Sequence, residues 1–226
     1  METSKGNAII LVSGGMDSCV TAAQAIKDSY KPFFLHINYG QRTKQREEKA
    51  FNDIANYYNV KEKLIIDISH FALIGGSSLT DKSIKVPKAN INSKKIPNSY
   101  VPFRNANILS IAVSWAETIN ANAIYIGAVE EDSSGYPDCR ESFFKSFQKT
   151  IEYGTKPETK ISIQTPLINL SKANIIKKGI SLNAPLHFTW SCYKAENKPC
   201  NECDSCILRK RGFNKAKIHD PISISN

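Results

Sequence analysis

A short polar loop between two structured segments carries the clearest chemistry of this chain. Residues 12–18 are Val-Ser-Gly-Gly-Met-Asp-Ser, preceded by the apolar run 8–12 and followed by a helix-forming stretch over 17–28. We expect a buried strand, a small-residue loop and a helix N-terminus. Glycines let a backbone approach a phosphate, free N–H groups point at it, and the helix dipole favours negative charge. The loop therefore predicts phosphate binding.

The predicted contacts come from both backbone and side chains. Ser13 and Ser18 add hydroxyl donors, and the Asp17 carboxylate can hold Mg²⁺ beside the phosphates. The predicted ATP-binding residues are Val12, Ser13, Gly14, Gly15, Met16, Asp17, Ser18 and, after a later strand, Gly127. No lysine follows the glycines, so this is not a loop of the G-x-x-x-x-G-K-[ST] type. It resembles the pyrophosphate loop of ATP pyrophosphatases, which cleave ATP to AMP and pyrophosphate while activating a substrate oxygen as an adenylate. An ordinary strand-to-helix turn is the alternative.

Four of the six cysteines gather near the C-terminal end. Cys192, Cys200, Cys203 and Cys206 have the spacing C-x7-C-x2-C-x2-C. Such short spacings let thiolates converge on one tetrahedral ion, and four of them leave no open position for a substrate. We expect a structural Zn²⁺ site, with an iron–sulfur cluster or four free thiols as the alternatives.

Three further strings extend the pattern. They are Val-Pro-Phe-Arg-Asn at 101–105, Glu-Asp-Ser-Ser-Gly-Tyr-Pro-Asp-Cys-Arg at 131–140 and Thr-Trp-Ser-Cys-Tyr at 189–193. Together with the loop, the cysteines and Tyr-Gly-Gln-Arg at 39–42, they make the chain closely resemble the 7-cyano-7-deazaguanine synthase family over about residues 8–213. Two departures from the common family pattern are Thr43, where many members have His, and Asn201, where many have Gly.

The resemblance implies a reaction and its reactants. A 7-carboxy-7-deazaguanine carboxylate would be activated by ATP and attacked by ammonia to give an amide. A second activation by ATP would remove the amide oxygen and give a nitrile, a step in the biosynthesis of queuosine and related 7-deazapurines. The enzyme would thus be a ligase that forms C–N bonds, with ATP and Mg²⁺ as co-substrate. Because no glutaminase-like domain is recognisable, free ammonium is the expected nitrogen donor.

The resemblance also suggests roles for individual residues. Asp138 would accept the N–H donors of the guanine-like edge, and Tyr136 would stack on the base. Arg140 or Arg104 would pair with the substrate carboxylate, since a guanidinium matches it as a fork. With Asp17, these two arginines and Asp138 are the predicted catalytic residues. Local capping by Arg104 and a turn role for Asp138 are the structural alternatives.

Alternating segments must position these residues. We expect strands at 8–12, 32–38, 63–68, 123–127 and 161–165, and helices at 17–28, 42–58, 105–119, 139–153 and 171–179, with a long loop over 75–100. This order predicts an α/β fold with a doubly wound parallel sheet and ligands at the carboxyl ends of its strands. The family resemblance implies the adenine nucleotide alpha hydrolase-like form of this fold. We place an ATP pyrophosphatase-like domain at 1–183 and a small zinc-binding segment at 184–226.

Composition limits the remaining possibilities. The 226 residues are 41% hydrophobic and 23% charged, with a net charge of +9. No apolar run approaches 18 residues and the start lacks a signal-peptide pattern, so we expect a cytoplasmic enzyme with no membrane contact. The lysines are scattered, so direct nucleic-acid binding is not expected, and a homodimer is possible. Three alternatives remain open: a tRNA-modifying enzyme of thiolase type on the same ATP loop, a non-enzymatic zinc module that binds a nucleotide as a ligand, and a synthase that conjugates the deazapurine to another acceptor.

Overall fold

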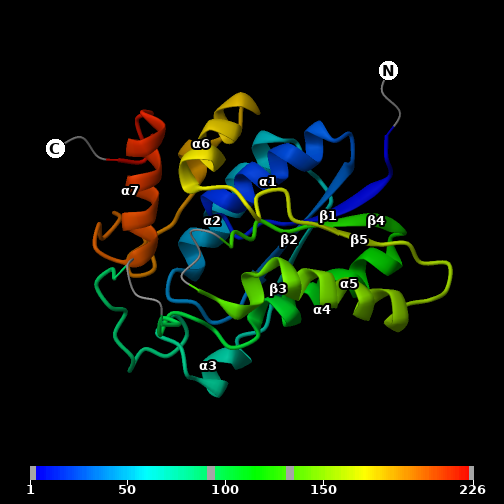
Figure 1. The fold of residues 1–226 in the computed structure, drawn as a ribbon, viewed down its shortest axis with the longest axis horizontal. Helices are drawn as coiled ribbons and strands as arrows, with labels where there is room; N and C mark the ends of the chain where they lie inside the picture. Colours follow the sequence, from blue (N-terminus) through cyan, green and yellow to red (C-terminus); the bar gives the residue numbers. More distant parts are fainter. Residues whose placement is uncertain (1–3, 91–94, 131–134, 224–226) are drawn as a thin grey trace.

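Five parallel strands form one sheet at the centre of the molecule (Figure 1). The computed structural model describes residues 4–90, 95–130 and 135–223, so residues 131–134 of the string at 131–140 lie outside it. The strands are β1 (Asn7–Leu11), β2 (Lys31–Asn38), β3 (Lys63–Asp67), β4 (Ala121–Tyr125) and β5 (Ser162–Gln164). Their order is β3-β2-β1-β4-β5, and every pairing is parallel. The predicted doubly wound α/β fold is confirmed.

Helices cover both faces of the sheet (Figure 1). Helices α1 (Met16–Lys27), α2 (Lys44–Tyr57) and α6 (Lys172–Ser181) lie on one face. Helices α4 (Arg104–Thr118) and α5 (Glu141–Gly154) lie on the other. A short α3 (His70–Ile74), two single-turn 3-10 helices (Pro137–Cys139 and Leu186–Phe188) and a C-terminal α7 (Asp204–Ala216) complete the described elements.

Strand β1 explains why the sheet is buried on both faces. Successive side chains of a strand point to opposite faces. Accordingly Ile10 packs into the core beneath α1, α2 and α6, whereas Ile9 packs into the core beneath α4 and α5. Both side chains are fully buried. This burial fixes the register of the central strand and therefore the position of the loop that follows it.

Two helices were not predicted, and the helices predicted from residues 42 and 139 each start two residues later, at Lys44 and Glu141. Helix α7 was not predicted because it begins directly after Cys203, inside the segment that we interpreted as a metal site. Helix α3 was not predicted because it is only five residues long. The helix expected from Cys139 begins at Glu141, because Pro137–Cys139 forms a separate 3-10 turn. The segment 75–100 is largely irregular where it is described, and Arg42 anchors it. The Arg42 guanidinium donates to backbone carbonyls of this segment at 2.7–2.8 Å.

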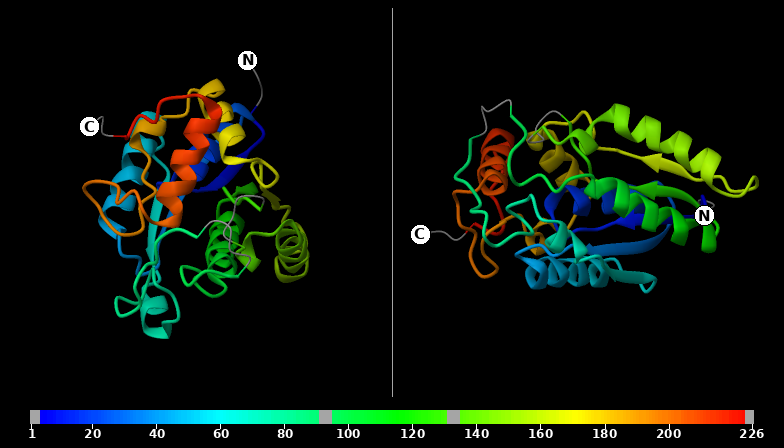
Figure 2. Two further views of the ribbon diagram at one scale, coloured as in Figure 1. Left: turned by 60° about the vertical axis from the view of Figure 1, so that its left-hand side comes forward. Right: turned by 90° about the horizontal axis from the view of Figure 1, so that it is seen from below.

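The C-terminal segment packs against the sheet domain (Figure 2). Phe213 and Ala216 of α7 contribute to the same core as Ile176 of α6. Arg209 makes a bidentate ion pair with Asp220, both N···O distances being 2.8 Å. The boundary at residues 183 and 184 stays a prediction of the sequence. Among the described residues, no helix is long and apolar enough to cross a membrane.

Candidate active site and metal centre

A cavity of about 290 Å³ lies where the strands end. Leu11 of β1, Ile37 of β2 and Ile126 just after β4 line its floor, so it sits at the carboxyl edge of the sheet. In open parallel sheets this edge is where ligands bind, at the point where the strand order reverses. Most of the predicted ATP-binding residues line the cavity: Val12, Ser13, Gly15, Met16, Asp17, Ser18 and Gly127.

The glycine loop, residues 12–18, leads into a helix start at this cavity. Helix α1 begins at Met16, and its N-cap Gly15 has no side chain to accept a hydrogen bond from the first turn. The loop is braced by its serines, because Ser18 Oγ donates to the Gly15 carbonyl at 2.9 Å and Ser13 Oγ to Ser18 Oγ at 3.2 Å. A helix start of this kind favours an anion through its N–H groups and its dipole.

Two glycines are needed for close packing around the loop. Gly14 has a φ of +84°, and a Cβ placed on it would lie 2.5 Å from the Glu47 carbonyl oxygen of α2. A Cβ on Gly127 would lie 2.9 Å from Ser18 N in the first turn of α1. Any larger residue at either position would separate the loop from its neighbours. Gly14 therefore shapes the loop without lining the cavity.

A cation from a distant element meets the loop. Lys172, the first residue of α6, places its Nζ 2.6 Å from Asp17 Oδ2 inside the cavity. The other carboxylate oxygen, Asp17 Oδ1, is buried and has no hydrogen-bond partner among the described residues. An orphaned buried carboxylate oxygen beside an anion site fits a hard cation such as Mg²⁺. Sequence reasoning missed Lys172, although its position directly after the Ser171 N-cap was a usable signal.

Another part of the cavity wall is aromatic and cationic. The Arg104 guanidinium lies over the Tyr39 ring, 4.8 Å from the ring centroid. Arg104 Nε is buried and has no hydrogen-bond partner among the described residues, and Tyr136 and Tyr193 line the same wall. Tyr136 is fixed by a 2.8 Å hydrogen bond between its hydroxyl and Ser99 Oγ. This wall can hold a planar ring and offer a guanidinium to a carboxylate.

Two of the predicted substrate residues lie outside the cavity lining. Asp138 is buried, and its Oδ2 accepts the backbone N–H of Asn105 at 2.9 Å, which caps the start of α4. Its Oδ1 is buried and has no hydrogen-bond partner among the described residues, and burial raises the pKa of this carboxyl above its ordinary value. Arg140 is exposed at the start of α5 and does not line the cavity.

Cys139 lines the cavity but is poorly suited to attack. Burial raises the pKa of this thiol to about 11, and the Asn105 amide donates to its sulfur at 3.3 Å. A thiol reacts as its thiolate, so a raised pKa keeps Cys139 inert at neutral pH. The thiol therefore serves here as a wall of the cavity.

Glu47 is a second carboxylate in the cavity that sequence reasoning missed. It lies in the first turn of α2, and its two carboxylate oxygens accept hydrogen bonds from Thr43 Oγ1 at 2.6 Å and Gln41 Nε2 at 3.2 Å. Burial raises the pKa of Glu47 to about 7, and the bonds from Thr43 and Gln41 only partly oppose that rise. Its signal in the sequence was its place in the first turn of the helix after the second strand, at the carboxyl edge of the sheet.

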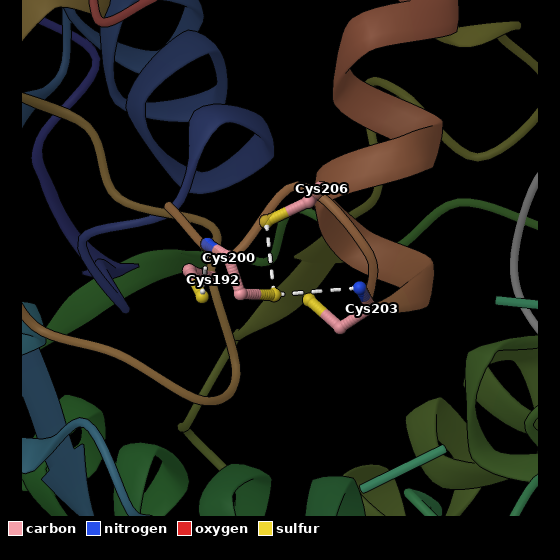
Figure 3. Close-up of side chains that lie close together, drawn as sticks. All are labelled: Cys192, Cys200, Cys203 and Cys206. Carbon is pink, nitrogen blue, oxygen red and sulfur yellow. Dashed lines mark hydrogen bonds between the residues drawn. The ribbon is translucent and has the colours of Figure 1, made fainter. Parts of the chain in front are cut away.

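The four predicted cysteine ligands converge at one point (Figure 3). The sulfurs of Cys192, Cys200, Cys203 and Cys206 all lie within 4.8 Å of one another, and those of Cys200 and Cys206 are 3.9 Å apart. A tetrahedral ion with metal–sulfur bonds of about 2.3 Å needs sulfurs separated by about 3.8 Å. Clusters of several irons spread their ligands further apart. The donor set thus fits a single tetrahedral metal ion.

The cysteine segment, residues 189–206, also forms part of the cavity. The backbone N–H of Trp190 donates to the Gly14 carbonyl at 2.8 Å, and the Trp190 indole lies under the Arg46 guanidinium at 4.6 Å. Glu196 accepts the backbone N–H groups of Gln45 and Arg46 at 3.1 and 3.3 Å, at the start of α2. The cysteine segment is therefore joined by hydrogen bonds to the glycine loop and to α2.

Comparisons with known proteins agree with this geometry. Residues 7–217 match the family model of the queuosine biosynthesis protein QueC. The chain is 57% identical over 215 residues to the 7-cyano-7-deazaguanine synthase of Chloroherpeton thalassium and 56% identical to that of Chlorobaculum parvum, covering 95% of both chains in each case. A 4-thiouridine synthetase solved with RNA and bound ATP has a TM-score of 0.52 at 19% identity, covering 92% of this chain and 53% of that one. A predicted tRNA methyltransferase subunit of Methanocaldococcus jannaschii has a TM-score of 0.50 at 15% identity, covering 97% and 92%.

The fold and the site thus define a nucleotide-binding enzyme of the doubly wound α/β class with a C-terminal cluster of four cysteines that fits a metal ion. The chain belongs to the QueC family of queuosine biosynthesis proteins. This confirms the resemblance drawn from the sequence motifs.

Proposed function

We propose that this protein converts 7-carboxy-7-deazaguanine, ammonia and ATP into 7-cyano-7-deazaguanine, acting as a ligase that forms C–N bonds. One observation carries the proposal: the glycine loop and the aromatic wall with Arg104 line the same cavity. A triphosphate and a planar acid held there would meet in one site. The relatives named above, which are identical to this chain at more than half of the aligned positions, are 7-cyano-7-deazaguanine synthases and support the same substrate.

The cavity supplies what the first step needs. Donors of the glycine loop and Lys172 would hold the phosphates, and Mg²⁺ on Asp17 would offset their charge. Arg104 would hold the substrate carboxylate in line with the α-phosphorus, so that a carboxylate oxygen attacks it and pyrophosphate leaves. Positioning of this kind can supply much of the rate enhancement. Ammonia would then attack the acyl carbon and displace AMP to give the amide.

The second step would reuse the same groups. The amide oxygen would attack a second ATP, and loss of the activated oxygen as AMP together with two N–H protons would leave the nitrile. Because the amide has the shape of the acid, Arg104 and the aromatic wall could hold both. We further propose that the metal ion at the four cysteines is Zn²⁺, because four thiolates in a closed shell suit that ion and leave no open position for substrate.

Arg104 is the better candidate of the two predicted arginines for the substrate carboxylate, since it lines the cavity and Arg140 does not. Asp138 could still receive the guanine-like edge through its unpartnered Oδ1 if the neighbouring turn admits the ring. Cys139 is the cysteine that lines the cavity among the described residues, and it gives a sulfur-transferring tRNA enzyme no support, because its raised pKa keeps the thiol protonated.

The test is a mass-spectrometric assay of the purified protein with ATP, Mg²⁺, ammonium and 7-carboxy-7-deazaguanine. We expect the nitrile, with the amide appearing first and AMP and pyrophosphate as the other products. ATP consumption without nitrile would overturn the proposed substrate. A conjugate in place of a free nitrile would identify the deazapurine-conjugating alternative, and modification of added tRNA would identify the tRNA-modifying one.

A further inference from the structure

The proposed function leaves one chemical need without an assigned group. Nitrogen enters as ammonium, which must lose a proton before it can attack. A second proton leaves the nitrogen after the C–N bond forms and AMP departs, and two more leave in nitrile formation. A proton acceptor beside the activated carbon would serve every one of these steps.

Two carboxylates, and no histidine, are among the described residues that line the cavity. Asp17 belongs to the glycine loop and is paired with Lys172 at 2.6 Å. Glu47 has no lysine or arginine nitrogen within ion-pair distance among the described residues, and only neutral groups, Thr43 and Gln41, donate to it. It is therefore free to exchange a proton without breaking an ion pair.

The backbone around Glu47 holds it next to the expected position of ATP. The Glu47 carbonyl packs on Gly14 so closely that a Cβ there would lie 2.5 Å away. The charged groups that face Glu47 are Arg104 from α4 and Glu196 from the cysteine segment, with Tyr39 as a further titratable neighbour. Glu47 therefore adjoins the glycine loop through its backbone and faces Arg104 through its carboxylate, in the cavity where the activated carbon would lie.

We propose that the Glu47 carboxylate is the proton acceptor for the incoming nitrogen, an inference that rests on the proposed function. Glu47 takes one proton from ammonium; the nitrogen lone pair then forms the C–N bond, and the C–O bond to AMP breaks with its electron pair on the departing phosphate. The second proton passes from nitrogen to Glu47 after the first has been released to solvent. Thr43 and Gln41 orient the carboxylate for this exchange.

A side chain that accepts protons near neutral pH suits the task, because a base works best when its pKa lies close to the operating pH. Burial gives Glu47 a pKa of about 7. The rate of amide formation should therefore rise with pH through this region and level off above it. The Thr43 hydroxyl lowers the pKa of Glu47, so Thr43→Val should move this rise upward by about half a pH unit to one unit.

The experiment separates adenylation from nitrogen transfer in Glu47→Gln. Substrate-dependent exchange of labelled pyrophosphate into ATP reports the first, and amide formation from ammonium reports the second. We expect exchange to stay within about threefold of wild type and amide formation to fall by about 10²–10⁴. Hydroxylamine is largely unprotonated at neutral pH, so its attack should be much less impaired. Asp53→Asn, a carboxylate of the same helix outside the cavity lining, is the matched control.

Three outcomes would overturn the inference. These are an unchanged amide rate and pH profile, an equal loss with ammonium and hydroxylamine, and a loss of pyrophosphate exchange that matches the loss of amide. Absence of exchange in the wild-type protein with 7-carboxy-7-deazaguanine would instead overturn the proposed function, and with it this step.

Discussion

The ammonium of Lys172 lies 2.6 Å from the carboxylate of Asp17, although 155 residues separate them in the chain. The pair joins the first turn of α1 to the first turn of α6 at the carboxyl edge of the sheet. A phosphate site normally needs a fixed cation, and the glycine loop has no lysine of its own. The fold thus places a cation from α6 beside a loop that has no lysine of its own.

We expect Lys172→Ala to weaken ATP use more than substrate binding. Loss of one cation aimed at the phosphates should lower pyrophosphate exchange by about 10²–10³. Asp17→Asn should lower it at least as much, because Asn is a weaker ligand for Mg²⁺. Exchange rates measured over a range of ATP concentrations test this, with the exposed Lys177→Ala on the same helix as control. An unaffected Lys172→Ala exchange rate would exclude a phosphate role.

The two predicted arginines should behave differently. Arg104 lies over the Tyr39 ring in the cavity, whereas Arg140 is exposed outside it. We expect Arg104→Gln to lower kcat/KM for the acid by about 10² or more, since a charge-assisted bond to the carboxylate is lost. Arg140→Gln should change it only a few-fold. Steady-state kinetics with varied acid decide between them, and a larger loss for Arg140 would show that the site closes over this residue when substrate binds.

Metal removal should disturb the active site as well as the C-terminal segment. Trp190 connects the cysteine segment to the Gly14 carbonyl, and it is buried. We expect Cys203→Ser to lose about one metal ion per chain, to shift Trp190 fluorescence toward the red and to abolish pyrophosphate exchange, because metal binding contributes on the order of 10 kcal/mol to such segments. Cys19→Ala, a buried thiol outside the cluster, should keep its metal. Metal analysis of the wild-type protein also identifies the ion. Full pyrophosphate exchange in metal-free protein would contradict the proposed dependence of the active site on the metal-bound cysteine segment.

The sequence predicted the site's chemistry where residues adjacent in the chain act together. The glycine loop is one strand-to-helix turn, and the four cysteines span fifteen residues of chain, so local spacing was enough to predict phosphate and metal binding. Lys172 and Glu47 have no such local pattern, since each is one charged residue in the first turn of an ordinary helix. Only the order of the strands in the sheet brings the first turns of α2 and α6 to the same carboxyl edge.

Asp138 shows a case in which a local motif did not reveal how the side chain is used in the fold. Its motif indicated a substrate contact, yet one of its oxygens is used to cap α4 through Asn105. A carboxylate beside a helix start stabilises that start, and this relation depends on how α4 and the 3-10 turn pack. No spacing rule in a single sequence contains that information.

Glu47 should also leave a signature in the stability of the protein. Its pKa is raised from 4.5 to about 7 in the folded chain, so its ionised form is disfavoured by folding. The stability associated with Glu47 is fully present below about pH 4.5 and is lost as the pH rises through about 7. A glutamine cannot ionise but can still accept the Thr43 hydrogen bond. After allowance for partial exposure of Glu47, the advantage of Glu47→Gln over wild type should therefore grow by about 1–2 kcal/mol between about pH 5.5 and about pH 8. Urea unfolding of metal-loaded protein at the two pH values measures this difference, with Asp53→Asn as the reference. If the difference in free energy of unfolding between Glu47→Gln and wild type does not change with pH, then Glu47 has an ordinary pKa. That result would remove the electrostatic support for its role as a proton acceptor.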